Sequence, residues 1–307
     1  MFQILKFKYQ ILRIAAIACL FAVMFSACAD PRPFADRSAT RSVTDDIGRT
    51  VTLPLELNRA ISLAPSVTEA VFAVGAGDRL VGVTTFCDYP EAAKSIAKIG
   101  DTMNPNMETI VALRPEIVFV STASQVEAFT RTLQENGIAV YVTNPESLSD
   151  VLKNLTRLGE LFDTPSLAEA KVAALRSRAA AARSAMQGSE RVGVFVQISK
   201  EPLFTIGKQS FLTELLESAS ARSLTADVET AYPKLSKETA LALNPEAIIL
   251  SDSEDNREPN EVFRNTPAVR NGRIYRVNAD LLSRPGPRLV DALEVIAKSL
   301  HPDKFPK

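Results

Sequence analysis

The 307-residue sequence has no tryptophan and a single histidine, His301, beside Pro302 near the C-terminus. One histidine so placed argues against a Ser–His or Cys–His nucleophile couple. No Gly-x-Ser-x-Gly elbow and no phosphate-cradling glycine loop occurs. A zinc or manganese receptor would ordinarily need a cluster of histidines with carboxylates. The sequence therefore gives no support for a hydrolase or for a histidine-rich metal site, and we expect neither an enzyme nor a bound metal.

The sequence also has no excess of either charge, and it has few cysteines. The 35 Lys and Arg residues nearly balance 36 Asp and Glu residues, for a formal net charge of −1, and the two signs are interspersed. Such a balance gives no support for nucleic-acid binding. Of three cysteines, Cys19 falls in the N-terminal apolar run and Cys28 at its end, where a signal would be cleaved and a lipid attached. Cys87 is then alone in the mature domain, so no internal disulfide is possible.

The one long apolar run, residues 14–25, is too short for a membrane span, which needs about 20 apolar residues. Lys6, Lys8 and Arg13 precede it, and small residues follow it. A positive start, a short hydrophobic middle and a small-residue cleavage site are typical of a secretory signal. We therefore expect residues 1–27 to be a signal peptide and the mature protein to be exported.

The end of this signal, residues 25–28 (FSAC), resembles the bacterial lipobox, in which the cysteine is acylated and becomes the new N-terminus. Phe25 departs from the pattern, because Leu is more frequent there. The resemblance predicts that Cys28 is lipidated and that the lipid alone anchors the protein on the periplasmic side. The alternative is ordinary cleavage with Cys28 a bystander. Ala29 follows Cys28 where the inner-membrane retention signal would have Asp, so the choice of membrane stays open.

The remaining chain divides into a tether and two similar α/β segments. Residues 28–42 are rich in Asp, Arg, Pro and Ser, which is typical of a flexible tether. A turn signal at 45–49 (DDIGR) predicts a short hairpin over 43–55. Strand-like and helix-like runs then alternate, which implies a mainly parallel sheet covered on both faces. We expect an N-terminal lobe at 43–146, linking helices at 147–188 and a C-terminal lobe at 189–307.

The expected elements follow from the apolar pattern. The expected strands are 60–63, 80–84, 117–120, 138–142, 192–198, 247–250 and 273–277. The expected helices are 68–74, 107–113, 125–135, 147–162, 210–217, 239–243 and 289–300, with a helical turn at 261–264.

A long helix is predicted between the two α/β segments, over residues 164–188. Thr164 can cap it, Pro165 suits the first helical position, and Gly188 is a natural stop. Apolar residues recur at spacings of four and three and form one stripe, with Arg176, Arg178 and Arg183 off it. The stripe consists of Ala168, Val172, Leu175, Ala179, Ala182 and Met186. Alanine is the best helix former, so this helix should act as a stiff strut between two lobes.

Two segments argue directly that the lobes are equivalent halves. Residues 108–116 (ETIVALRPE) and 238–246 (ETALALNPE) share the pattern Glu-Thr-x-x-Ala-Leu-x-Pro-Glu, and each leads into a hydrophobic strand. A helix, a proline and a strand could by themselves look alike. Identity in register at six positions is more than that accounts for.

These features together resemble the helical-backbone class of periplasmic substrate-binding proteins of ABC importers, which serve cobalamin, haem and iron–siderophore uptake. The resemblance runs from about residue 43 to the C-terminus. Its motifs are 45–51 (DDIGRTV), 63–69 (LAPSVTE), 81–90 (VGVTTFCDYP) and 110–116 (IVALRPE). Within the class, 201–208 (EPLFTIGK) and 232–233 (YP) look most like the cobalamin-binding members. It implies two Rossmann-like lobes with central parallel sheets, joined by one rigid backbone helix, and only modest lobe movement.

The resemblance also implies a ligand-binding site between the lobes, on loops at the strand ends, and no prosthetic group. Cobalamin is broad, flat and largely neutral, and aromatic faces would supply contact area for it. The residues at the matching positions are Ser66, Phe86, Phe204, Tyr232, Asp280 and Arg284. Each aromatic could equally be a core residue, and Asp280 with Arg284 could be a surface salt bridge. Haem or a ferric siderophore is the alternative ligand.

The sequence departs from the cobalamin binders at two first-lobe positions, where Thr102 and Ser121 replace tryptophan, which implies a wider cleft or a different corrinoid. Cys87, beside Phe86, could ligate a metal as a thiolate, but a lone buried cysteine is usually a small apolar filler. Tyr89 could be a haem ligand, but the plain alternative is that it only forms part of a Tyr-Pro turn, which is a common structure.

Glu108 and Glu238 begin short helices, one in each lobe. The resemblance implies that each docks on an arginine pocket of a two-fold symmetric permease, while the plain alternative is helix capping. The implied partners are the permease dimer with its ATPase and a small-molecule metal chelate, with the protein itself a monomer. A lipoprotein sensor or scaffold on the same fold is the remaining alternative.

Overall fold

The computed structural model describes residues 39–122 and 126–305. The chain divides into two units, residues 1–39 and 40–307, and the helices and strands of the described residues belong to the second. The predicted signal peptide, Cys28 and residues 29–38 of the predicted tether lie outside the described residues. Within the described part, no helix is both long and apolar enough to cross a membrane.

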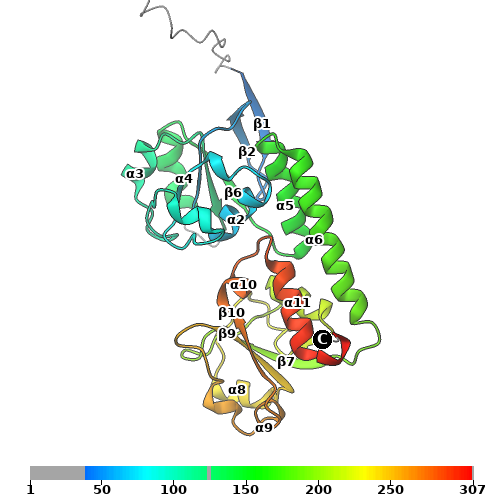
Figure 1. The fold of residues 1–307 in the computed structure, drawn as a ribbon. Helices are drawn as coiled ribbons and strands as arrows, with labels where there is room; N and C mark the ends of the chain where they lie inside the picture. Colours follow the sequence, from blue (N-terminus) through cyan, green and yellow to red (C-terminus); the bar gives the residue numbers. More distant parts are fainter. Residues whose placement is uncertain (1–38, 123–125, 306–307) are drawn as a thin grey trace, which may run out of the picture. The chain divides into compact units, whose positions relative to one another are not determined.

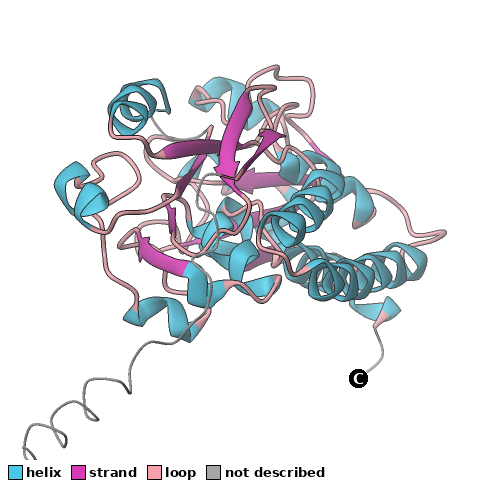
Figure 2. Ribbon diagram, turned by 90° about the horizontal axis from the view of Figure 1, so that it is seen from above, coloured by secondary structure: helices cyan, strands magenta, loops and turns pink. Residues whose placement is uncertain are grey.

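The first lobe is built on a four-stranded parallel sheet in the order β4-β3-β5-β6 (Figure 1). Its strands are β3 (Ala60–Ser62), β4 (Leu80–Val83), β5 (Ile117–Ser121) and β6 (Ala139–Thr143). Its helices are α2 (Pro65–Ala73), α3 (Met107–Ala112), α4 (Val126–Glu135) and α5 (Leu148–Leu161). Helices also flank the strands in the view from above (Figure 2).

The second lobe repeats this plan with a parallel sheet in the order β8-β7-β9-β10. Its strands are β7 (Val192–Gln197), β8 (Ala221–Ser223), β9 (Ala247–Asp252) and β10 (Ile274–Asn278). Its helices are α7 (Phe211–Ser218), α8 (Lys237–Ala242), α9 (Pro267–Arg270), α10 (Ala279–Ser283) and α11 (Leu289–Leu300). In both sheets the first strand of the lobe lies between its second and third, so the predicted equivalence of the lobes is confirmed.

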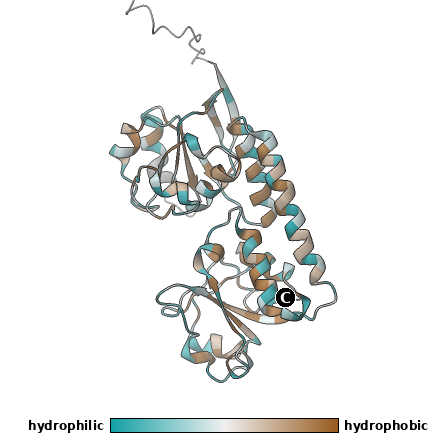
Figure 3. Cartoon of the chain, viewed as in Figure 1, coloured by the Kyte–Doolittle hydropathy of each residue, from teal (hydrophilic) through white to brown (hydrophobic). Residues whose placement is uncertain are grey.

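The central strands of both sheets are almost entirely apolar, as Figure 3 shows by their brown colour. All six residues of β7 are buried, and so are the first five of β9. Helices cover both faces of such a sheet, which is why its strands lack the alternation of a half-exposed sheet. This is the α/β architecture expected from the sequence.

The strut is the helix α6 (Pro165–Ala185), which packs against α5 of the first lobe and α11 of the second. Every member of the predicted apolar stripe is buried, and Gly188 has a φ of 74° just after the helix. Within the described residues the chain passes from one sheet to the other once, through these helices, and the sheets share no strand. One detail of the prediction is wrong: Thr164 occupies the cap position, but its side chain makes no capping hydrogen bond.

Polar contacts fasten the strut to the second lobe along its off-stripe side. Arg178 forms ion pairs with Asp291 and Glu294 of α11, each at 2.6 Å. Arg183 donates from Nε to the Oγ of Ser218 at the end of α7, at 3.1 Å. Where the strut meets the first lobe, Gly159 of α5 lies so close to Ala168 that an added Cβ would overlap it. The strut is thus packed on α5 and tied by charge to α11.

The repeated segments are equivalent in three dimensions as well as in sequence. Asn106 caps α3, and its side chain accepts a hydrogen bond from the backbone N–H of Thr109. Ser236 caps α8 in the same way and accepts from the backbone N–H of Thr239. The last glutamate of each repeat binds the start of the neighbouring strand. Glu116 accepts from the backbone N–H groups of Asn58 and Arg59, and Glu246 accepts from that of Gly193. The second glutamate of each motif is therefore a structural residue.

The structure differs from the sequence-based expectation in several short elements. The hairpin strands are β1 (Thr40–Thr44) and β2 (Thr50–Pro54), so residues 40–42, which were assigned to the tether, belong to β1. The helix expected at 68–74 begins three residues earlier, at Pro65, so Pro65 and Ser66 form the first turn of α2. Residues 279–283, expected in a loop, form α10, and β8 is absent from the predicted strands. These elements are only a few residues long and depend on tertiary pairing, so periodicity does not reveal them.

Candidate functional site

The predicted ligand-binding residues lie after strand ends at one edge of each sheet. Because all strands of each sheet are parallel, their carboxyl ends share an edge, which is where ligands bind in open α/β sheets. In the first lobe, Ser66 follows β3 and Phe86 follows β4. In the second lobe, Phe204 follows β7, and Asp280 and Arg284 follow β10. Direct contacts between side chains join the two edges.

Arg284 forms the centre of the contact between the lobes. Its Nη1 lies 2.8 Å from Oδ1 of Asp88 and 3.1 Å from Oε1 of Glu69, both in the first lobe. Its Nη2 lies 2.7 Å from Oδ1 of Asp280 and donates to the carbonyl oxygen of Phe86 at 3.3 Å. Its side chain is only 10% exposed. Both terminal nitrogens of this guanidinium are therefore already committed to protein acceptors.

Glu69 and Arg288 form the second part of this contact. Arg288 donates from Nε to Oε2 of Glu69 at 2.8 Å and from Nη2 to Oε1 at 2.6 Å, a two-point pairing between α2 and the start of α11. The Glu69 side chain is 1% exposed and that of Arg288 is 16% exposed. The Arg288 guanidinium also lies 4.3 Å from the centre of the Tyr89 ring, a cation–π contact. We call Glu69, Asp88, Asp280, Arg284 and Arg288 the junction cluster.

The ionisation of the junction cluster follows from these contacts. Partial burial acts to raise the pKa of Asp88, but the Arg284 guanidinium outweighs it and holds that pKa below the usual 3.8. Burial opposes the charge on Arg284, yet hydrogen bonds to Asp88 and Glu69 raise its pKa. The Glu69 carboxylate raises the pKa of Arg288 in the same way. Three carboxylates therefore face two guanidiniums, an excess of one negative charge.

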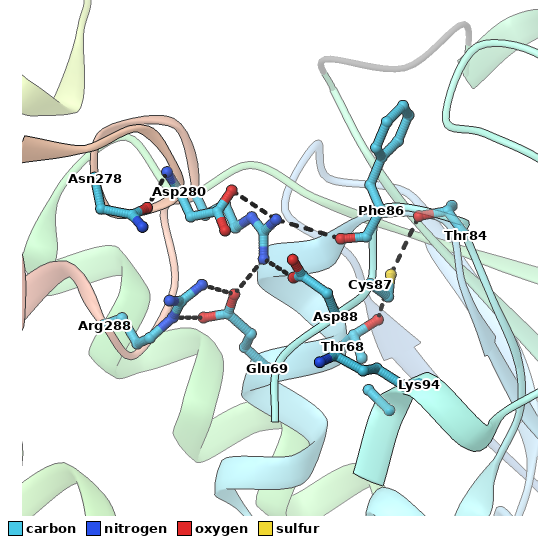
Figure 4. Close-up of polar contacts among 12 residues, drawn as sticks. Thr68, Glu69, Thr84, Phe86, Cys87, Asp88, Lys94, Asn278, Asp280 and Arg288 are labelled. Carbon is cyan, nitrogen blue, oxygen red and sulfur yellow. Dashed lines mark hydrogen bonds and ion pairs between the residues drawn. The ribbon is translucent and has the colours of Figure 1, made fainter. Parts of the chain in front are cut away.

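Phe86 and Ser66 lie at the rim of this cluster. The Phe86 side chain is 58% exposed, and Figure 4 shows its ring pointing away from the charged groups. Its carbonyl oxygen accepts the hydrogen bond from Arg284. Phe86 is therefore not the core aromatic that the plain alternative suggested. Ser66 is half-buried against the second lobe, where a side chain on Gly286 would come within 3.3 Å of its backbone oxygen. The structure thus brings Ser66, Phe86, Asp280 and Arg284 together.

Phe204 and Tyr232 form a second group, on two loops of the second lobe that are held together by backbone hydrogen bonds. Thr205 N–H donates to the carbonyl of Pro233 at 3.1 Å, and Gly207 N–H donates to that of Ala231 at 2.9 Å. Tyr232 is 43% exposed, and partial burial raises its pKa. Phe204 is half-buried. Neither aromatic is fully in the core, and both lie at the same edge of the second sheet.

A buried amide network fixes the loop that carries Phe204. Gln197, the last residue of β7, donates to Oδ1 of Asn256 at 2.6 Å, and Asn256 returns a bond to the Gln197 carbonyl at 2.9 Å. Asn260 donates to the carbonyl of Lys200 at 2.9 Å. Buried and mutually satisfied amides of this kind restrict a loop to one conformation. The loop is therefore presented rigidly beside the strand end.

Glu108 and Glu238, the predicted docking residues, are both exposed on the first turns of α3 and α8. Asn106 and Ser236 make the N-cap hydrogen bonds, while Glu108 and Glu238 lie in the first turns, where a carboxylate is also favoured by the free N–H groups, so both interpretations stay open. A backbone hydrogen bond and the Ser236 hydroxyl lower the pKa of Glu238. Leu241, one turn further along α8, is 56% exposed beside it.

Cys87 and His301 are structural residues. Cys87 is buried and accepts a hydrogen bond from the Thr68 hydroxyl at 3.1 Å, with Thr84 Oγ1 at 3.2 Å. The described residues include no group of three or more His, Cys, Asp or Glu side chains placed to hold a metal ion. His301 is buried with its Nε2 3.3 Å from the Ser220 carbonyl.

Sequence reasoning missed Glu69, Asp88 and Arg288. A signal for Glu69 was present, since it is the one acidic residue in the apolar run 67–74 and belongs to a helix with a mostly buried face. Two arginines four residues apart, in the segment 284–288 (RPGPR), offered a second signal. Their pairing was not predictable, because the partners are 215 and 219 residues apart.

Comparison with known proteins agrees with this geometry. The family described as "Periplasmic binding protein" matches residues 61–281. The chain is 32% identical to the uncharacterized ABC transporter substrate-binding lipoprotein YvrC of Bacillus subtilis, over 94% of this chain and 97% of that one. The structure of the periplasmic vitamin B12-binding protein BtuF of Vibrio cholerae matches with a TM-score of 0.71 and 27% identity, covering 82% of this chain and all of that one. A periplasmic heme-binding protein from Pseudomonas aeruginosa matches with a TM-score of 0.72 and 27% identity, covering 82% and 95%.

Proposed function

The chain belongs to the periplasmic binding protein family, and we propose that it captures cobalamin or a related corrinoid between its lobes and delivers it to the permease of an ABC importer. Its relatives and fold neighbours are substrate-binding proteins and not enzymes. It therefore binds its cargo without altering it.

One observation carries the choice of ligand: the arginines of the junction cluster are already matched by carboxylates, while an aromatic ring stands exposed beside them. Arg284 and Arg288 hold five contacts at 3.1 Å or less to carboxylate oxygens, and Phe86 is 58% exposed. A ligand with carboxylates would have to break these pairs. A largely neutral ligand with a broad apolar face would keep them and cover the ring.

The six predicted ligand-binding residues take these parts in the proposal. Phe86, Phe204 and Tyr232 supply ring faces from both lobes, and Ser66 presents the first turn of α2. Asp280 keeps lone pairs for an amide N–H of the ligand, because its ion pair with Arg284 uses one of its two oxygens. Arg284 acts by holding Phe86 and Asp280 in place, and not as a free cation.

A second candidate ligand, haem or a ferric siderophore, is favoured by a different observation. Tyr89 is 48% exposed beside the junction cluster, and a tyrosine oxygen can ligate ferric iron. Arg288 covers one face of its ring, so the phenol oxygen rather than the ring would be the available part.

The test is incubation of the purified mature protein with cyanocobalamin, haemin or a ferric hydroxamate, followed by desalting and visible spectroscopy. The proposal expects retained corrinoid absorbance in a one-to-one ratio. Retention of haemin or of the hydroxamate alone would move the function to the second candidate. A sensor, scaffold or hydrolase would retain no chromophore.

Delivery is proposed to use Glu108 and Glu238, one exposed carboxylate on each lobe at equivalent helix starts. Two like sites on two equivalent lobes suit a two-fold symmetric permease, and carboxylates pair well with arginine. The N-terminal lipid on Cys28 is proposed to hold the protein at the membrane, in keeping with the relative that is named a lipoprotein.

A further inference from the structure

Glu69 is a buried carboxylate at the contact between the lobes. Its side chain is 1% exposed, and it lies on α2 of the first lobe while its ion pairs are with guanidiniums of the second. Burying a carboxylate is costly unless it is paired and hydrogen-bonded. A lobe interface made only for packing would place an apolar residue here, as its neighbours Ala70 and Val71 are.

The contacts of Glu69 show what its charge does. Its carboxylate accepts hydrogen bonds from Nε and Nη2 of Arg288 and a third from Nη1 of Arg284. Arg284 also forms ion pairs with Asp88, through Nη1, and with Asp280, through Nη2. Without Glu69, Arg288 would keep its stacking on Tyr89 and lose the carboxylate that pairs with it.

We propose that Glu69 is a specificity-determining residue, which neutralises Arg288 and so makes the cleft reject ligands that carry carboxylates. The proposal rests on the proposed function in one respect, that the ligand lies at this edge of the lobes. The physical basis of the proposal is that a guanidinium with two free N–H donors on one side is the preferred bidentate partner of a carboxylate. In the native protein, Glu69 already fills that face and adds to the negative charge of the cluster.

The test compares two ligands of one shape and different charge, haemin and its dimethyl ester, by absorbance titration. Glu69→Gln should bind haemin about tenfold or more tightly than the native protein does, the change expected from one recovered charge-assisted hydrogen bond. Binding of the uncharged ester should stay within about twofold. The double variant Glu69→Gln, Arg288→Gln lacks the freed guanidinium. If its affinity for haemin returns to the native value, the effect of Glu69→Gln is assigned to Arg288.

Glu294→Gln is the matched control, since it removes a carboxylate from an ion pair with Arg178 away from the cleft. It should leave both titrations unchanged. If Glu69→Gln is too unstable to purify, Glu69→Asp keeps the charge but withdraws it by one methylene, and the same comparison applies with the same expected direction.

Equal changes for haemin and its ester in Glu69→Gln would overturn the proposal, because they would indicate a purely structural role. Failure of haemin to bind either protein would overturn it as well. Discrimination by charge in a protein that does not retain cyanocobalamin would uphold this role of Glu69 and overturn the proposed corrinoid function. The two conclusions therefore fail separately.

Discussion

Arg284 of the second lobe donates a hydrogen bond to the backbone carbonyl of Phe86 in the first, with Nη2 and O 3.3 Å apart. The bond fixes the main chain of Phe86 and leaves its ring, which is 58% exposed, directed away from the charges (Figure 4). An exposed aromatic held from behind by a buried cation is pre-organised for contact with a ligand face. The arrangement needs both lobes.

Phe86→Ala should weaken corrinoid binding about tenfold to a hundredfold, the range expected when the burial of one phenylalanine is lost. Phe86→Tyr should keep most of the affinity, because the ring face remains. Leu55→Ala, at another exposed apolar position, is the control and should change nothing. Titration by tyrosine fluorescence or by absorbance would measure this, and unchanged affinity in Phe86→Ala would remove the ring from the site.

Glu108→Ala combined with Glu238→Ala should leave ligand affinity intact and reduce uptake by cells, because both carboxylates are exposed and neither caps its helix. Glu169→Ala with Glu190→Ala removes two other exposed carboxylates and serves as the control. Uptake of labelled cobalamin by complemented cells is the measurement. Normal uptake by the first double variant would exclude the docking role.

Gly159→Ala should destabilise the fold by roughly 1–3 kcal/mol, since the added methyl group would overlap Ala168 where α5 meets the strut. Urea unfolding would measure this loss as a lower midpoint with an unchanged dependence of the unfolding free energy on urea concentration. Adding Ala168→Gly should recover part of the loss by making room, despite a helix-propensity cost of about 1 kcal/mol. Strictly additive losses in the double variant would show that the two positions do not crowd each other.

Acid should weaken the link between Asp88 and Arg284. The folded-state pKa of Asp88 is held below 3.8, so its ion pair stabilises the protein above that pH and is lost as the pH falls through the lower folded value. Asp88→Asn should therefore be less stable than the native protein at neutral pH, and the difference should shrink as the pH falls below 3.8 through the lowered folded-state pKa of Asp88. Urea unfolding across this range tests it. A difference that persists at the acidic end would assign the loss to packing instead.

Cys28→Ser should abolish incorporation of labelled palmitate and release the protein from the membrane fraction, because the thiol is the proposed site of acylation. Cys87→Ser is the control, and it should keep the label, because Cys87 is buried in the first lobe. Label retained by Cys28→Ser would place the acylation at another residue, and absence of label from the native protein would leave ordinary signal cleavage as the explanation. Fractionation of cells by density would then show which membrane carries the native protein.

Sequence alone determined the architecture, for a physical reason that is local. Alternating apolar runs specify buried strands and covering helices, and a stripe such as Ala168 to Met186 can be satisfied only by a helix with one buried face. The repeated Glu-Thr-x-x-Ala-Leu-x-Pro-Glu pattern specified two equivalent lobes, because a cap, a short helix and a following strand are all encoded within about ten residues. Phe86, Glu108 and Glu238 were singled out by the resemblance to a known family, and not by this local pattern.

Tertiary structure alone decided how the charges of the site are used. Nothing near Glu69 in the sequence indicates that it meets Arg284 and Arg288, and Arg284 could have been a free cation facing the ligand. Pairing between residues more than 200 positions apart depends on where two sheets place their edges, and no local pattern carries that information. The sequence indicated which residues follow the strand ends, and the contact between the lobes determined that the arginines of the junction cluster are already paired with carboxylates.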